Sequence, residues 1–130
     1  EAKAKGYRLL TYISSKATNY AKSIGENCFV FEDNTIQPFV EIGDNCILWS
    51  GNHIGHHSVV DANVFISSHV VISGHCKIGS YSFLGVNSTL RDGIKIAEDT
   101  VLGAGCLIVK DTTPNTIYIG TKASPYEPKK

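Results

Sequence analysis

The sequence predicts an all-β protein whose chain winds as a parallel β-helix of about five triangular coils. Every sixth residue from Ile24 to Ile108 is Ile, Val or Leu, without a miss in fifteen positions. A helix buries apolar residues every 3.6 positions and a simple strand every second one, whereas a period of six with one obligatory aliphatic residue indicates a hexapeptide-repeat β-helix.

The position four residues after each aliphatic residue supports the same fold. It holds small residues almost throughout, which suits a second inward site near a corner. All four cysteines, Cys28, Cys46, Cys76 and Cys106, fall there. We therefore interpret them as small core residues rather than as disulfide partners or reactive thiols.

The position three residues after each aliphatic residue is predicted to be the turn. It is Asn, Asp, Gly or His in thirteen of fifteen repeats, and the exceptions are Phe39 and Tyr81. These residue types tolerate a left-handed backbone. His57, His69 and His75 all occupy this position, so each has a structural explanation.

Three repeats make one coil, and residues eighteen apart stack, so the outward positions can be sorted by face. Two faces are solvated or mixed. The third face is apolar on every coil, with Phe31 and Trp49 beside it. It is too extensive to remain exposed to solvent. It is predicted to pack against another subunit, a cyclic trimer being the natural assembly for a three-sided prism and a dimer the alternative. This face consists of Phe29, Ile47, Phe65, Phe83 and Val101.

The repeat region spans 24–112. Residues 1–23 break the period, with Glu1–Lys5 expected to end a helix and Tyr7–Ile13 expected to form a strand that leads into the first coil. In 113–130, Pro114-Asn115 predicts a turn into a short final strand before a frayed tail from Ala123. The absence of Met and the start at Glu1 favour a fragment of a longer chain.

Charge and composition narrow the function classes. The formal net charge is zero, so nothing suggests nucleic-acid binding, although residues 24–108 carry three basic residues against nine acidic ones, a net of −6. No segment reaches the ~18 apolar residues of a membrane span, and no signal peptide is visible. We expect a cytoplasmic protein with no membrane partner.

The repeats, together with the closing stretch Gly103–Ala123, resemble the left-handed β-helix acyltransferases. Within them, Asn52-His-Ile-Gly-His-His-Ser-Val-Val60 is similar to the bacterial sugar O-/N-acetyltransferases of the sialic-acid O-acetyltransferase type. The resemblance spans about residues 7–123. It implies a left-handed coil, trimers, acetyl-CoA as donor and active sites between subunits. It also implies an amino-terminal domain that binds a nucleotide-linked sugar, of which only residues 1–23 would remain here.

Acetyl transfer to a hydroxyl or amine needs a base that works near neutral pH, and histidine suits this role. His56 and His53 are the two histidines that lack a structural reason for their positions. The family motif places the base on His56, with His53 as second choice. The family often has an acid directly after the base, but here His57 stands there in a possible orienting role, and Asp61 or Asp44 could substitute.

The resemblance also places acetyl-CoA. Gly74 stands above His56 and leaves room for the pantetheine arm, and Val86 and Ala104 of the next subunit would complete the groove. Phe65 replaces a histidine that relatives use near the thioester, and Lys110 could meet the CoA phosphates. No metal is expected.

Two alternatives remain beside the acetyltransferase. One is a non-catalytic trimerisation or CoA-binding fragment. The other is a γ-class carbonic anhydrase, which shares the fold and binds zinc through three histidines. His57, His69 and His75 do not match that ligand spacing, and turn geometry already explains them.

Overall fold

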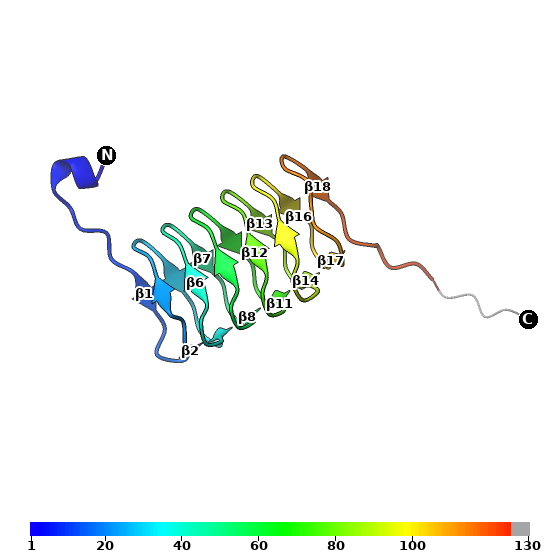
Figure 1. Ribbon diagram of the computed structural model, residues 1–130, viewed down its shortest axis with the longest axis horizontal. Helices are drawn as coiled ribbons and strands as arrows, with labels where there is room; N and C mark the ends of the chain where they lie inside the picture. Colours follow the sequence, from blue (N-terminus) through cyan, green and yellow to red (C-terminus); the bar gives the residue numbers. More distant parts are fainter. Residues whose placement is uncertain (126–130) are drawn as a thin grey trace, which may run out of the picture.

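In the computed structural model, which describes residues 1–125, the chain forms a three-sided prism of stacked coils with a 3₁₀ turn, η1 (Lys3–Lys5), projecting from one end (Figure 1). Eighteen two-residue strands lie in three parallel sheets, one for each side of the prism. The fold is a left-handed parallel β-helix, as predicted.

Each sheet collects every third strand along the chain. Sheet A consists of β1 (Tyr12–Ile13), β4 (Phe29–Val30), β7 (Ile47–Leu48), β10 (Phe65–Ile66), β13 (Phe83–Leu84), β16 (Val101–Leu102) and β18 (Ile117–Tyr118). Sheet B consists of β2 (Thr18–Asn19), β5 (Thr35–Ile36), β8 (His53–Ile54), β11 (Val71–Ile72), β14 (Thr89–Leu90) and β17 (Leu107–Ile108). Sheet C consists of β3 (Ser23–Ile24), β6 (Glu41–Ile42), β9 (Val59–Val60), β12 (Lys77–Ile78) and β15 (Lys95–Ile96).

The prism has about six coils rather than the five that the period predicts. The extra coil lies before Ile24, where Tyr12 pairs with Phe29 and Thr18 with Thr35. These partners are seventeen residues apart, one fewer than the eighteen of Phe29 and Ile47. One residue is therefore missing from the repeat between Asn19 and Ile24. A strict six-residue period counted back from Ile24 consequently does not detect this coil.

The flanks differ from expectation in detail. The 7–13 strand reduces to β1, while the turn at Pro114-Asn115 does lead into β18. Residues 126–130 of the predicted tail lie outside the described part of the chain. Across residues 1–125, no helix is long or apolar enough to cross a membrane.

The core confirms the roles of the repeat positions. The aliphatic residues from Val30 to Leu102 are at most 3 % exposed, and the four cysteines are buried and free. Small polar side chains at the second inward site donate to a backbone carbonyl fifteen residues later, as Cys46 Sγ does to Asp61 O (3.2 Å) and Ser82 Oγ to Ala97 O (3.1 Å). These bonds join each coil to the next, which explains why small donors occupy the site.

The turn prediction is also confirmed. Fourteen of the fifteen turn positions have positive φ, including all three histidines and the two exceptions, Phe39 (66°) and Tyr81 (61°). The corners that follow from these turns carry the candidate site. We call residues 49–52, 67–70, 85–88 and 103–106 the A–B corner, and residues 55–58, 73–76 and 91–94 the B–C corner, after the sheets they join.

Candidate active site on the B–C corner

His56 lies on the B–C corner, between β8 and β9, with an exposed side chain. Its backbone N–H donates to Gln37 Oε1 at 2.9 Å, which fixes the start of the turn. Its ring Nδ1 lies 3.1 Å from Nδ1 of His57, so one of the two nitrogens donates and the other accepts. Of the orienting partners that the sequence left open, His57 is the one whose ring contacts that of His56. Asp61 pairs with Lys77 instead, and Asp44 accepts from Glu26 N–H.

The other ring nitrogen of His56 lies close to Gly74. A Cβ placed on Gly74 would lie 2.7 Å from His56 Nε2 and 3.0 Å from Asp92 Oδ1. Both atoms thus border the same point, one from the coil below and one from the coil above. Gly74 is buried and has no side chain, so the His56 ring can lie over it. We call the point between His56 Nε2 and Asp92 Oδ1 the gap, with a basic nitrogen on one side and a carboxylate on the other.

Two further histidine rings gather at this corner. His57 and His75 have φ of 58° and 56°, as their turn positions require. Their rings stack at 4.9 Å with planes 12° apart, and Phe39 stacks on His57 from the coil below at 4.7 Å. The ring of His75 also meets that of His56 edge-on at 5.0 Å. Turn geometry accounts for the backbone of these residues, but it does not account for the three imidazoles meeting.

The remaining two histidines lie elsewhere. His53 is on β8 with its side chain facing outward between Thr35 and Val71 of the neighbouring strands. His69 belongs to the A–B corner, with its ring over Gly51, where a Cβ would come within 2.6 Å. The trio considered for zinc, His57, His69 and His75, is therefore split between two corners.

The residues expected to contact CoA are divided between two edges of sheet B. Gly74 lies with His56 on the B–C corner, whereas Val86 and Ala104 are exposed one above the other on the A–B corner. Lys110 is exposed beyond β17. Phe65 lies on sheet A, stacked on Phe83 at 5.2 Å. One chain does not bring these groups into a single groove.

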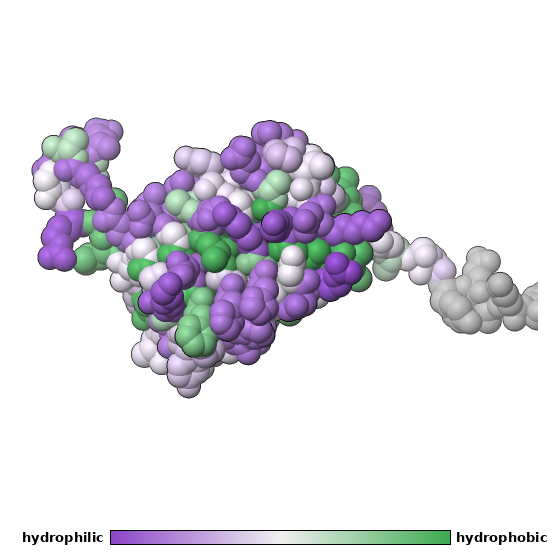
Figure 2. Space-filling view, viewed as in Figure 1, coloured by the Kyte–Doolittle hydropathy of each residue, from purple (hydrophilic) through white to green (hydrophobic). Residues whose placement is uncertain are grey.

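The outward side of sheet A is apolar, as the sequence predicts. Phe29 and Phe83 remain about two-fifths exposed, and Trp49 stacks on Phe31 at 4.8 Å with planes 9° apart. On the last coil, exposed Ile117 of β18 continues this apolar side. Apolar exposure on this scale is typical of a surface that a partner covers. A different, largely polar face is seen in Figure 2, with some apolar surface toward the C-terminal end.

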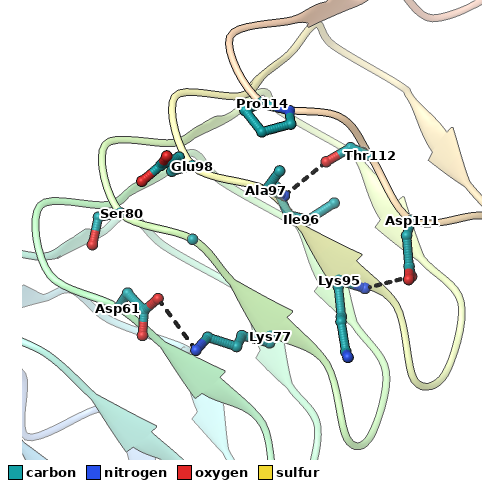
Figure 3. Close-up of a pocket in the computed structure, with 11 residues that line it drawn as sticks. Asp61, Lys77, Ser80, Lys95, Ile96, Ala97, Glu98, Asp111, Thr112 and Pro114 are labelled. Atoms are coloured by element: carbon teal, nitrogen blue, oxygen red, sulfur yellow. Dashed lines mark hydrogen bonds and ion pairs between the residues drawn. The ribbon is translucent and has the colours of Figure 1, made fainter.

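A hollow of about 470 Å³ lies away from the histidines. It lies over β12 and β15 and the corner that follows them, between Lys77, Lys95, Glu98 and Asp111 (Figure 3). Lys77 pairs with Asp61 at 3.7 Å, and Asp111 accepts from the backbone N–H of Lys95. Within residues 1–125, Lys77 and Asp61 form the only ion pair among these charged groups, and none of the five histidines lines the hollow.

Two features of this corner were not predicted from the sequence. The first is the approach of Asp92 to Gly74, and the second is the contact between the rings of His75 and His56. The first could have been found, because residues 56, 74 and 92 share a column. The second could not, because it depends on side-chain rotation between neighbouring columns.

Comparison with known proteins agrees with the fold. The family "Bacterial transferase hexapeptide (six repeats)" matches residues 22–56, and "Hexapeptide repeat of succinyl-transferase" matches residues 76–110, which together exceed half of the chain. The chain belongs to the hexapeptide-repeat acyltransferases. A histidine-to-asparagine variant of perosamine N-acetyltransferase from Caulobacter crescentus, in complex with CoA and GDP-perosamine, is 26 % identical with a TM-score of 0.88 over 92 % of this chain.

Two further proteins are similar to this chain. The acetyltransferase domain of PglB from Neisseria gonorrhoeae, in complex with acetyl coenzyme A, is 28 % identical with a TM-score of 0.87 over 96 % of this chain. The acyl-[acyl-carrier-protein]–UDP-N-acetylglucosamine O-acyltransferase of Burkholderia orbicola is 33 % identical over 85 residues, 65 % of this chain. The chain spans about a third of that relative's length, and 57 % and 62 % of the two structures.

Proposed function

We propose that this chain is the acyltransferase part of an acetyl-CoA-dependent sugar acetyltransferase, with His56 as general base. The observation that carries the proposal is the gap over Gly74, bordered by His56 Nε2 and Asp92 Oδ1. An acceptor amine there could give one hydrogen to His56 Nε2 and the other to Asp92 Oδ1, whereas an acceptor hydroxyl would give its single hydrogen to His56. The relatives in complex with CoA, acetyl coenzyme A and GDP-perosamine support acetyl-CoA as donor and a nucleotide-linked amino sugar as acceptor.

The proposed role requires one arrangement of protons at the contact between His56 and His57. To accept a proton at Nε2, neutral His56 must carry its hydrogen on Nδ1, which then donates to Nδ1 of His57 at 3.1 Å. His57 must in turn hold its own hydrogen on Nε2. A neutral imidazole thus orients the base here, without the negative charge that a carboxylate would supply.

The reaction then needs one proton to move twice. His56 Nε2 takes the proton as the acceptor oxygen or nitrogen attacks the thioester carbonyl carbon. The tetrahedral intermediate collapses with cleavage of the carbon–sulfur bond, and His56 returns the proton to the departing CoA sulfur. Throughout, His56 keeps the Nδ1 hydrogen bond to His57, so the ring stays aimed at the gap.

Acetyl-CoA is proposed to lie between two copies of the chain. Gly74 would contribute from the B–C corner of one copy, with Val86 and Ala104 from the A–B corner of the next, because these corners are opposite edges of sheet B. The apolar side of sheet A borders the A–B corner and supplies the hydrophobic contact for a homotrimer. The proposed places of Phe65 and Lys110 are near the thioester and near the CoA phosphates. Four buried free thiols suit a reducing compartment such as the cytoplasm.

The direct test measures CoA release from acetyl-CoA with a panel of GDP- and UDP-linked amino sugars. His56→Ala is expected to lower kcat by at least ~10²-fold and to leave acetyl-CoA affinity nearly unchanged, because the base acts in the chemical step. His53→Ala serves as the matched control and should stay near the wild-type rate. Saturable acetyl-CoA binding without turnover on any acceptor would instead favour a non-catalytic CoA-binding fragment.

A mixing experiment tests whether the site spans two copies. His56→Ala and Ala104→Trp each disable one half of the proposed groove, and Ala104 is exposed, so the larger side chain has room to fold. Co-refolding equal amounts of the two inactive variants should restore about a quarter of the wild-type sites by random assembly of a cyclic oligomer. Mixtures that stay inactive would place both halves in one chain.

A further inference from the structure

We infer that His56, His57 and His75 together form a binding site for a divalent transition-metal ion of the zinc and nickel class. Each side chain offers one ring nitrogen, and the three nitrogens lie within 4.8 Å of one another. Acetyl transfer as proposed above uses only His56 and His57. The third imidazole, and the meeting of all three, are left without a role in that reaction.

The backbone holds the three side chains as a unit. His75 N–H donates to His56 O at 2.9 Å, so the two coils are joined at this point. His57 and His75 occupy the same left-handed turn on successive coils, and Phe39 stacks beneath His57. These contacts fix the origin of each side chain, so a metal ion would meet a largely preformed set of ligands and would not have to order a loop.

The donor set selects the class of ion. Neutral imidazole suits zinc, nickel, copper and cobalt, whereas magnesium and calcium prefer oxygen ligands. Among residues 1–125, no carboxylate forms an ion pair with any of the three histidines, so the site lacks the charge that hard cations need. Water can fill the fourth position of a tetrahedral ion, or Asp92 Oδ1 can reach it across the gap above Gly74.

The required movement is small. Two nitrogens about 2.0–2.1 Å from a tetrahedral zinc ion lie about 3.4 Å apart, so a pair separated by the full 4.8 Å must close by about 1.4 Å. His57 and His75 are stacked nearly parallel, and one ring must also rotate to aim its lone pair at the ion. All three side chains are exposed, and exposed rotamers interconvert on the ps–ns timescale.

Binding at this site has a consequence that rests on the proposed function. The ion would occupy a lone pair of His56 or pull its ring away from the gap, and the base could no longer take a proton. The metal would therefore act as a reversible inhibitor of acetyl transfer and not as its cofactor.

Calorimetric titration of EDTA-treated full chain with ZnCl₂ tests the site directly. We expect one saturable site per chain. His75→Asn should weaken binding at least ~10-fold, the lower end of what even an outer-shell partner of a metal contributes. Asparagine keeps the left-handed turn, and His69→Asn is the matched control, since it makes the same change in the same turn on the other corner. The control should bind zinc as the wild type does. Either no saturable heat or equal binding by His75→Asn would overturn the inference.

A second readout separates this inference from the proposed function. Where transfer is measurable, ZnCl₂ should inhibit the wild type near the calorimetric Kd, EDTA should restore the rate, and His75→Asn should work at the basal rate but resist zinc. Zinc binding without transfer on any acceptor would refute the proposed function and leave the metal site standing. Transfer that keeps its rate while zinc saturates the calorimetric site would refute inhibition by the metal and leave the proposed function standing.

Discussion

Gly74→Ala tests the geometry of the proposed active site with a single methyl group. The added Cβ would lie 2.7 Å from His56 Nε2, whereas ordinary contact begins at 3.4 Å. The imidazole must therefore retreat by about 0.7 Å, and a displacement of about 1 Å can lower a rate 10²-fold, so we expect kcat to fall by about 10–100-fold. The neighbours that must move are the ends of two exposed side chains, His56 and Asp92, so the variant should remain folded.

The assay compares initial rates of CoA release, with circular dichroism as the check on folding. A double-mutant cycle supplies the decisive comparison. If the methyl group acts by displacing His56, then Gly74→Ala should have no further effect on the residual rate of His56→Ala. Gly55→Ala is the structural counterpart, since its Cβ would lie 2.4 Å from the backbone carbon of Ser73 and should destabilise the fold itself. A folded Gly74→Ala protein with the wild-type rate, or an equal loss in the His56→Ala background, would refute the reasoning.

Four further predictions concern the prism. Leu84→Ala should lower the free energy of unfolding, measured in urea, by about 2–5 kcal/mol because Leu84 is fully buried. Val71→Ala on the surface should change it by no more than about 0.5 kcal/mol, and equal losses would contradict the assigned core. Tyr81→Asn should stabilise the chain by about 1 kcal/mol in the same assay, because Tyr81 holds a left-handed backbone at φ 61°, and a loss of stability would show that its ring packs usefully. All four cysteines should resist a thiol reagent in the native state and react only in guanidinium, and fast labelling of any one would show that the coils open. Phe83→Asp should lower the sedimentation mass by breaking the sheet A contact, while Lys95→Glu on sheet C should not.

The repeat made most of the fold predictable because each position in a coil has a fixed environment. Inward aliphatic residues, small donors such as Ser82 and left-handed turns such as that of His57 all follow from position alone. The prediction of five coils was wrong because a single residue is missing between Asn19 and Ile24. A strict six-residue period ends at such a shift in register, so the coil before it was not counted.

The candidate site was less predictable because stacking fixes columns but not side-chain rotation. The column of residues 56, 74 and 92 is visible in the sequence, and the structure places two of its side chains around the third position. The contacts of His56 with His57 and His75 run between columns and depend on rotamers. The catalytic role of His56 and the places of the CoA-contacting residues remain predictions.

The proposed trimer and the proposed CoA site depend on each other. In a cyclic assembly whose axis is parallel to the prism, equivalent coils of all copies lie at the same height along that axis. His56 of one copy would then face the 49–52 segment of its neighbour's A–B corner, beside Trp49, because these two segments belong to the same coil. On the neighbour, Val86 and Ala104 lie two and three coils above that level, on the same side as Gly74. The pantetheine arm would accordingly run toward the C-terminal end, and the acceptor would approach from the other end, past the stacked rings of Trp49 and Phe31. An assembly that offsets the copies by one coil would separate these groups, so the mixing experiment tests the alignment of the coils together with the identity of the site.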